Sequence, residues 1–259
     1  MTKVNFHTHT KRCKHAFGED EQYVQAAISQ GLTALGFSDH APFPDGRWSF
    51  SRMSFTDLAS YCEHIRQLAK VYQQQIDIIL GLEIEYDPAQ LDYYAQLLNE
   101  YELDYLLLAQ HYFIDMDDQE HSSFQITRAR DLELYAYSLI EAMETGIFGF
   151  VAHPDVMFNS YPAWDETCIK VSKAILQAAQ DLQLPLELNA NGLRKGLQDF
   201  ADEKRYPYPH YRFWELAKDY DVPVVINSDC HHYQEVYDQA VEQAHMIAKE
   251  LGLRVVTRF

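Results

Sequence analysis

The sequence predicts an α/β fold: a parallel barrel, or a distorted relative of one with seven strands. Seven short β-branched or apolar runs alternate with longer segments of helical period. Several runs are apolar throughout, as expected of parallel strands that are covered on both faces. Seven strand–helix units fill the 259 residues. We therefore expect one domain over residues 1–259, because α/β barrels often use about 250 residues as a single unit.

The expected strands are short once their polar ends are removed, and each is followed by a helical segment. The strand runs are Lys3–His9, Ala34–His40, Ile76–Tyr86, Tyr105–Phe113, Phe148–Asp155, Leu184–Asn191 and Val222–His231. The helical segments are Gln22–Gln30, Thr56–Gln74, Pro88–Glu100, Thr127–Thr145, Asp165–Leu182, His210–Tyr220 and Gln234–Leu251. Thr56–Gln74 shows the period most clearly, because its apolar residues recur at three- and four-residue steps.

Composition and charge exclude several classes of protein. The 21 basic and 39 acidic residues give a net charge of −18, which argues against nucleic acid as a partner because such binders need a basic footprint. No apolar run approaches the length of a membrane span, and the amino terminus lacks the apolar core of a signal peptide. The four cysteines form no close pair, which is typical of reduced thiols in a cytoplasmic enzyme. Nothing in the composition indicates the oligomeric state.

Histidines and carboxylates gather where the expected strands end. Imidazole or carboxylate side chains end six of the seven strands, and one histidine lies in the loop after the first. These residues, in chain order, are His7, His9, His15, His40, Glu83, His111, His153, Asp229 and His231. Barrel enzymes build their active sites at the carboxyl ends of the strands. One histidine in such a place is most often only hydrogen-bonded, but nine side chains in this arrangement favour a metal centre.

The spacing of these residues has a geometric reason. Alternate residues of a strand point the same way, so His7 and His9 can reach one ion, as can Asp229 and His231. Imidazoles and carboxylates together suit zinc, manganese or iron. Nine ligands are too many for one tetrahedral ion, so we expect two or three divalent metals and a bridging carboxylate, Glu83. The five remaining histidines are expected to be surface or packing residues: His64, His121, His210, His232 and His245.

The motifs at these positions resemble those of the polymerase-and-histidinol-phosphatase (PHP) superfamily. The match runs, in order, through FHTHT, His15, SDHA, GLEIEY, the strand-ending QH, AHPD and SDCH. The motifs GLEIEY and ELNANGLRKG, with no polymerase module attached, look like the stand-alone L-histidinol phosphate phosphatase branch.

This resemblance implies a fold, a metal centre and a reaction. The fold would be a distorted seven-stranded TIM-like (β/α) barrel, with three metal ions at the carboxyl ends of its strands. The first ion would be held by His7, His9, Glu83 and Asp229. Glu83 would bridge to a second ion held by His111 and His153, and the third would be held by His15, His40 and His231. The implied substrate is a small phosphate ester, L-histidinol phosphate.

The hypothesised reaction is phosphomonoester hydrolysis, in which a hydroxide bridging two metals attacks phosphorus in line. Catalytic roles are expected for Glu83, Asp229 and Asp39, where Asp39 either orients a ligand imidazole or donates a proton. Arg194 is the first candidate for binding phosphate because its planar fork reaches two oxygens at once. Lys195 and Arg47 are weaker candidates.

Three other functions stay open on the sequence. The same metal centre could hydrolyse nucleotides or other small phosphate esters. A metal-dependent amidohydrolase is less favoured, because many of those place a bridging lysine where this chain has His111. A scaffold or metal-storing barrel without catalysis would keep the same ligands, and only turnover separates it from an enzyme.

Overall fold

The computed structural model describes residues 2–115 and 119–259 of the chain. The chain divides into two compact units that alternate along the sequence. Unit 1 comprises Met1–Ile84, Ala89–Leu107 and Asn227–Glu242, and unit 2 comprises Glu85–Pro88, Leu108–Ile226 and Gln243–Phe259. The single domain over 1–259 stays a prediction. Within the described residues, no helix is long and apolar enough to cross a membrane.

Unit 1 is built from parallel strands with helices between them. In the part of the sheet that it holds, the strands neighbour one another in the order β1-β2-β3-β4. The strands are β1 (Val4–Asn5), β2 (Ala34–Phe37), β3 (Asp77–Ile84) and the start of β4 (Tyr105–Leu108). The helices are α1 (Asp20–Ser29), α2 (Leu58–Tyr72) and α3 (Leu91–Asn99), with short 3₁₀ turns η1 (Lys11–Cys13), η2 (Phe55–Asp57) and η6 (Tyr233–Glu235). The turn η3 (Pro88–Gln90) begins in unit 2 and ends in unit 1.

The register within unit 1 aligns the carboxyl ends of its strands. Val4 pairs with Ala34 and Ala34 pairs with Asp77, all in parallel. Parallel bridges continue past the strand ends, joining Thr8 to Cys230 and His40 to Glu83. The segments that follow β1, β2 and β11 therefore end beside one another and beside Glu83.

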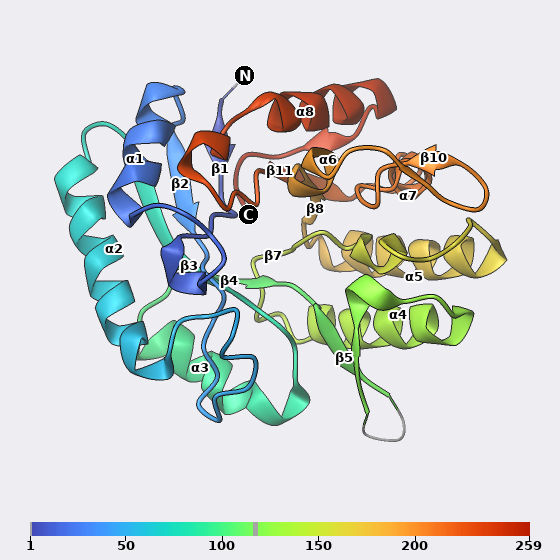
Figure 1. The fold of residues 1–259 in the computed structure, drawn as a ribbon, viewed down its shortest axis with the longest axis horizontal. Coiled ribbons are helices and arrows are strands. Elements are labelled where there is room, and N and C mark those ends of the chain that lie inside the picture. Colours follow the sequence, from blue (N-terminus) through green and yellow to red (C-terminus); the bar gives the residue numbers. More distant parts are fainter. Residues whose placement is uncertain (1, 116–118) are drawn as a thin grey trace. The chain divides into compact units, whose positions relative to one another are not determined.

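Helix α2 shows why the apolar period of the sequence produces a helix that packs on the sheet. Its buried residues are Leu58, Tyr61, Cys62, Ile65 and Leu68, which follow the three- and four-residue steps expected of one helical face. Figure 1 shows this helix lying along β3, with which it makes extensive contact. The predicted stripe is confirmed, although the helix itself is shorter than Thr56–Gln74.

Unit 2 continues the parallel strands and adds two antiparallel hairpins. Its strands neighbour one another in the order β4-β7-β8-β11-β12. These are the end of β4, β7 (Phe150–Val151), β8 (Leu186–Asn189), β11 (Pro223–Asn227), whose last residue belongs to unit 1, and β12 (Arg254–Val255). The hairpins pair β5 (Tyr112–Ile114) with β6 (Glu120–Ser122), and β9 (Gln198–Asp199) with β10 (Lys204–Arg205).

The helices of unit 2 lie between these strands, as in unit 1. They are α4 (Ala129–Glu144), α5 (Glu166–Leu182), α6 (Asn191–Arg194) and α7 (Tyr211–Ala217), with turns η4 (Ser123–Gln125) and η5 (Val156–Phe158). Helix α8 (Gln239–Leu251) begins in unit 1 and ends in unit 2. Figure 1 shows α4 and α5 side by side.

The predicted fold class is confirmed as an α/β fold of the distorted TIM-like barrel kind. The parallel strands follow chain order and are joined by helices. The seven expected strands are present, and the two-residue β12 adds an eighth, parallel to β11. The run Tyr105–Phe113 is one strand in the prediction, but β4 ends at Leu108 and β5 pairs antiparallel with β6. This part of the prediction was wrong, because a turn at His111, whose N–H bonds to Ala109 O, separates the two strands.

In unit 1, Tyr105 ties three strands together below the ligand-bearing segments. Its hydroxyl donates to the carbonyl oxygens of Phe6 at 2.6 Å and Phe37 at 3.3 Å. Two glycines make room for it: a Cβ built on Gly81 would lie 2.4 Å from the Tyr105 ring, and one on Gly36 would lie 2.5 Å from its hydroxyl. Because Phe6 immediately precedes His7, the hydrogen bond from Tyr105 helps to fix the position of the His7 backbone.

We expect Gly81→Ala to lower the free energy of unfolding of the metal-free protein by about 1–3 kcal/mol, because the added methyl overpacks the site against the Tyr105 ring. Urea unfolding measures the change. The penalty should shrink in a Tyr105→Leu background, since the double-mutant cycle isolates this contact. An equal penalty in both backgrounds would show that the ring is not the cause.

Candidate metal centre

In unit 1, four side chains from three different segments converge on one small volume. His7 and His9 follow β1, Glu83 lies within β3, and Asp229 follows β11. His7 Nε2 lies 3.0 Å from His9 Nε2, and the same two nitrogens each lie 3.2 Å from an oxygen of Glu83. Asp229 Oδ1 lies 3.5 Å from His7 Nε2 and 3.3 Å from His9 Nε2. All four side chains are buried.

These separations match the edges of a metal coordination sphere. Ligand atoms bound at about 2.0–2.1 Å in a tetrahedral zinc site lie about 3.3 Å from one another. The five measured separations between these four groups span 3.0–3.5 Å. Two imidazoles and two carboxylates are donors that zinc, manganese and iron accept. The residues present therefore fit a divalent ion.

The electrostatics of this cluster follow from its burial. Burial by itself lowers the pKa of His9, but the carboxylates of Glu83 and Asp229 outweigh it and raise the pKa to about 9. Burial would raise the pKa of Asp229, yet the imidazoles of His7, His9 and His231 hold it well below its usual range. The cluster thus carries buried negative charge that attracts cations.

A second group of imidazoles stands next to the first, also in unit 1. It comprises His15, His40 and His231, with ring centroids 5.2 Å apart for His15 and His40 and 4.8 Å for His15 and His231. His40 Nδ1 contacts Glu83 at 2.8 Å. Nitrogens of His9, His40 and His231 lie within 4.8 Å of one another. The three histidines expected to hold one ion are therefore brought together.

The remaining two ligand candidates meet in unit 2. The rings of His111 and His153 have centroids 5.1 Å apart. His111 Nδ1 lies 2.9 Å from Glu85 Oε1, and the His153 backbone N–H donates to Glu187 Oε2 at 3.0 Å. A carboxylate on the second ring nitrogen is the usual way of orienting an imidazole toward a metal. Glu85 and Glu187 were missed by the sequence reasoning. The signal for Glu85 was its spacing, two residues after Glu83 in the expected strand run Ile76–Tyr86.

Backbone strain marks two of the nine positions. His153 has φ +27° and Asp229 has φ +49°, backbone angles that residues other than glycine rarely adopt. Such conformations persist where the surrounding structure enforces them, and they gather at functional sites. In both cases the residue lies two positions after the last residue of a buried strand, where the chain turns at the strand's carboxyl end.

Asp39 directly precedes His40 in unit 1, and its buried side chain reaches the loop that follows His9. Its carboxylate accepts the Thr10 backbone N–H at 2.8 Å and the Thr10 hydroxyl at 2.9 Å. Burial raises its pKa to about 6 despite the attraction of His9 and the bonds from Thr10. Since Thr10 follows His9 directly, these bonds favour the positioning role, and proton donation stays a prediction.

The three cations expected to bind substrate lie in different settings. Arg194 ends α6 in unit 2 and is partly buried. The Lys195 ammonium lies 4.5 Å from the centre of the Tyr208 ring and 5.2 Å from that of Phe124, whose ring stacks on His111. Arg47 is in unit 1 and forms an ion pair with Asp45 at 2.6 Å. Lys195 therefore stands near ligand candidates of its own unit, whereas Arg47 is paired with a neighbouring carboxylate.

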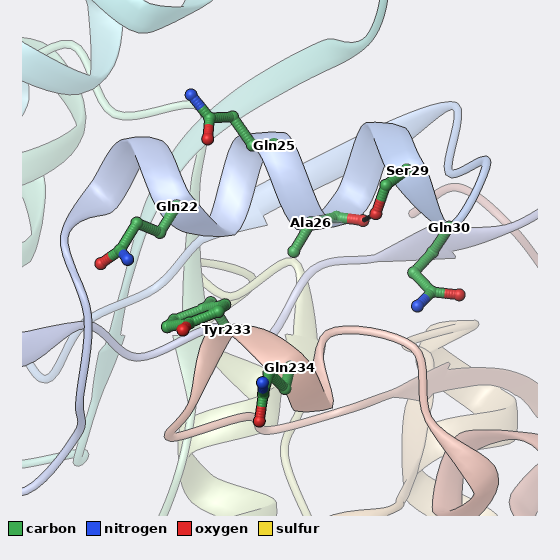
Figure 2. Close-up of a pocket in the computed structure, with 7 residues that line it drawn as sticks. All are labelled: Gln22, Gln25, Ala26, Ser29, Gln30, Tyr233 and Gln234. Carbon is green, nitrogen blue, oxygen red and sulfur yellow. Dashed lines mark hydrogen bonds between the residues drawn. The ribbon is translucent and has the colours of Figure 1, made fainter.

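A surface pocket in unit 1 differs from these groups in the chemistry of its lining residues. Figure 2 shows it between α1 and the η6 turn, with Gln22, Gln25 and Gln30 above Tyr233 and Gln234. The described residues that line it carry neither an imidazole nor a carboxylate. It offers amide groups to solvent and lacks the donors of a metal centre.

The comparison with known families identifies the domain that carries most of these residues. The model of the PHP domain matches residues 5–191, which include seven of the nine ligand candidates. The chain belongs to the PHP domain family.

Its relatives include phosphatases whose sequences align with nearly the whole chain. This PHP protein is 29% identical to a probable histidinol-phosphatase of Deinococcus radiodurans, over 97% of this chain and 94% of the relative. It is 25% identical to the histidinol-phosphatase of Bacillus subtilis, over 91% of this chain and 96% of the relative.

A solved structure shares the fold. Histidinol phosphate phosphatase from Lactococcus lactis, determined with zinc, L-histidinol and phosphate, superposes with a TM-score of 0.75 at 18% identity, over 100% of this chain and 97% of the other. With its family and its buried ligand clusters, the chain is a PHP-family metal-dependent phosphatase.

We expect the purified protein to hold two or three divalent ions per chain, measured by elemental analysis after gel filtration. Glu83→Ala should remove at least one ion and abolish phosphatase activity, because its carboxylate contacts His7, His9 and His40 at once. His64→Ala is the matched control, since His64 is an exposed histidine of the same unit. Fewer than one ion per wild-type chain, or an active Glu83→Ala protein, would contradict the ligand assignment.

Proposed function

We propose that this PHP phosphatase hydrolyses L-histidinol phosphate to L-histidinol and phosphate. The observation that carries the proposal is the convergence of His7, His9, Glu83 and Asp229 at metal-ligand separations. The two relatives named as histidinol-phosphatases support the substrate, because they align over nearly all of this chain.

We assign the metals by the groups in which the ligands occur. His7, His9, Glu83 and Asp229 hold one ion, and His15, His40 and His231 hold another in the same unit. His111 and His153 hold an ion in unit 2, and the bridge from Glu83 to that ion stays a prediction. When bound, divalent ions lower the pKa of a coordinated water and stabilise the charge that develops on a transferred phosphoryl group.

The protein side chains supply orientation and charge. Glu85 fixes the His111 ring by accepting from Nδ1, which leaves Nε2 as the coordinating nitrogen. The Asp39–Thr10 bonds hold the segment that carries His9. Arg194 offers a planar pair of donors suited to two phosphoryl oxygens. Lys195, beside Tyr208 and Phe124, adds a second cation in the same unit.

The experiment is phosphate release by the metal-loaded protein from L-histidinol phosphate, compared with a panel of nucleoside monophosphates and simple phosphate esters. We expect kcat/KM to be highest for L-histidinol phosphate. A higher kcat/KM for a nucleotide would replace the proposed substrate with the second candidate, a nucleotide phosphoesterase. Absence of turnover on every ester by fully loaded protein would contradict phosphatase activity itself.

Arg194→Ala should lower kcat/KM for L-histidinol phosphate about 10- to 100-fold, mostly through KM, because a charge-assisted hydrogen bond contributes about 1.5–3 kcal/mol. Steady-state kinetics at constant metal loading measure the effect. Arg130→Ala, an exposed arginine of the same unit, should leave kcat/KM unchanged. If the two variants behave alike, Arg194 does not contact the substrate.

A further inference from the structure

One buried thiol lies within the imidazole group of unit 1 and has no role in the function proposed above. Cys13 is fully buried. Its sulfur and one nitrogen each of His15 and His231 all lie within 4.8 Å of one another. The other three cysteines are buried too, but Cys62 and Cys168 lie within helices α2 and α5.

The local backbone explains how Cys13 and His15 come to share this volume. Cys13 ends the single turn η1, which is capped by Thr10 and anchored through Thr10 to Asp39. Lys14 then adopts the left-handed conformation, with φ 68°, and its N–H bonds to Lys11 O. This reversal of the chain at Lys14 brings the Cys13 sulfur and a His15 ring nitrogen close together. His7 and His9 are also separated by one residue and also meet, but there the backbone is extended.

Both imidazoles beside the sulfur are oriented by backbone carbonyls. His15 Nδ1 lies 2.7 Å from Cys13 O, and His231 Nδ1 lies 3.2 Å from Asp229 O. A carbonyl oxygen can only accept, so Nδ1 carries the proton in each ring and Nε2 keeps its lone pair. This is the arrangement by which proteins prepare a histidine for coordination through Nε2.

The sulfur is a thiol in the metal-free chain, because burial and the nearby carboxylate of Asp39 raise the pKa of Cys13 to about 12. A metal ion deprotonates a thiol that coordinates it. The position of the sulfur beside two imidazoles is therefore the observation that makes Cys13 a candidate ligand.

We propose that Cys13 is a thiolate ligand of the ion held by His15 and His231. The proposal rests on the metal binding proposed for this group, and it adds a sulfur donor to it. On binding, the S–H bond breaks, the proton leaves to solvent, and a sulfur–metal bond forms with no change of oxidation state. A thiolate selects softer ions, so this position prefers zinc or iron over manganese.

Cobalt(II) substitution tests the proposal without measuring activity, because a cobalt–thiolate bond gives a charge-transfer absorption in the near ultraviolet that nitrogen and oxygen ligands do not give. The apoprotein is titrated with cobalt(II) up to full loading. We expect this absorption in the wild-type chain and in the control Cys62→Ala, and its loss in Cys13→Ala. Its absence from fully loaded wild-type protein, or its survival in Cys13→Ala, overturns the proposal.

Two further measurements keep the proposal testable if Cys13→Ala does not fold. X-ray absorption of zinc-loaded wild-type protein should show sulfur at about 2.3 Å from zinc, and nitrogen and oxygen neighbours alone would refute the ligand. In a folded Cys13→Ser protein, zinc affinity relative to manganese should fall at least about tenfold, the lower end of what loss of a ligand's supporting contact costs.

The outcome is separable from that of the proposed function. A cobalt–thiolate absorption in a protein that does not hydrolyse L-histidinol phosphate would retain Cys13 as a ligand and reject the substrate. If the protein hydrolyses that substrate and takes up cobalt without showing the absorption, the proposed substrate is retained and Cys13 is rejected as a ligand.

Discussion

The burial of two carboxylates at one point in unit 1 governs the arrangement of that unit. Glu83 and Asp229 are 1% and 4% exposed, and isolated charges at such depth are strongly unfavourable unless cations or donors surround them. The imidazoles around them meet this need in the metal-free chain, where the raised pKa of His9 reflects the negative field. A divalent ion can take over the same role, since it brings more positive charge to the same volume than a proton does.

That requirement connects the fold to the chemistry. Parallel strands place their carboxyl ends at one edge, so residues far apart in the sequence can face a common volume without long insertions. In unit 1 the parallel bridge from His40 to Glu83 continues the sheet into the cluster itself. The positions of these candidate ligands therefore follow from strand register more than from the length of loops.

Much of this could be predicted from the sequence, because periodicity and spacing are local signals. The apolar stripe of α2 and the alternate positions of His7 and His9 are examples. The hairpins β5–β6 and β9–β10 could not be found in this way, since their strands are only two or three residues long and too short to show a period. Nor could the end of β4 at Leu108, because apolar residues resume at Tyr112 and Phe113 directly after Gln110 and His111.

The contacts that support the site were harder to foresee. Glu85 and Glu187 act through side-chain geometry that depends on where a strand turns, and the positive φ angles of His153 and Asp229 have no signature in residue type. The bonds between Asp39 and Thr10 join two loops that lie about thirty positions apart. The convergence of the candidate ligands could be predicted because it depends on which residues end the strands, whereas the orientation of their side chains depends on tertiary packing.

The Tyr105 hydroxyl, with Gly36 and Gly81 beside it, has a consequence for how this chain can change over evolutionary time. A bulkier residue at Gly81 is tolerated only after the phenol has been replaced by something smaller, whereas one at Gly36 would also meet the Phe6 backbone. A smaller residue at position 105 leaves a void and removes the donor from the carbonyl oxygens of Phe6 and Phe37. Positions 81 and 105 should therefore drift together, so that paired substitutions at them in divergent sequences would record the same spatial contact, while position 36 should stay glycine.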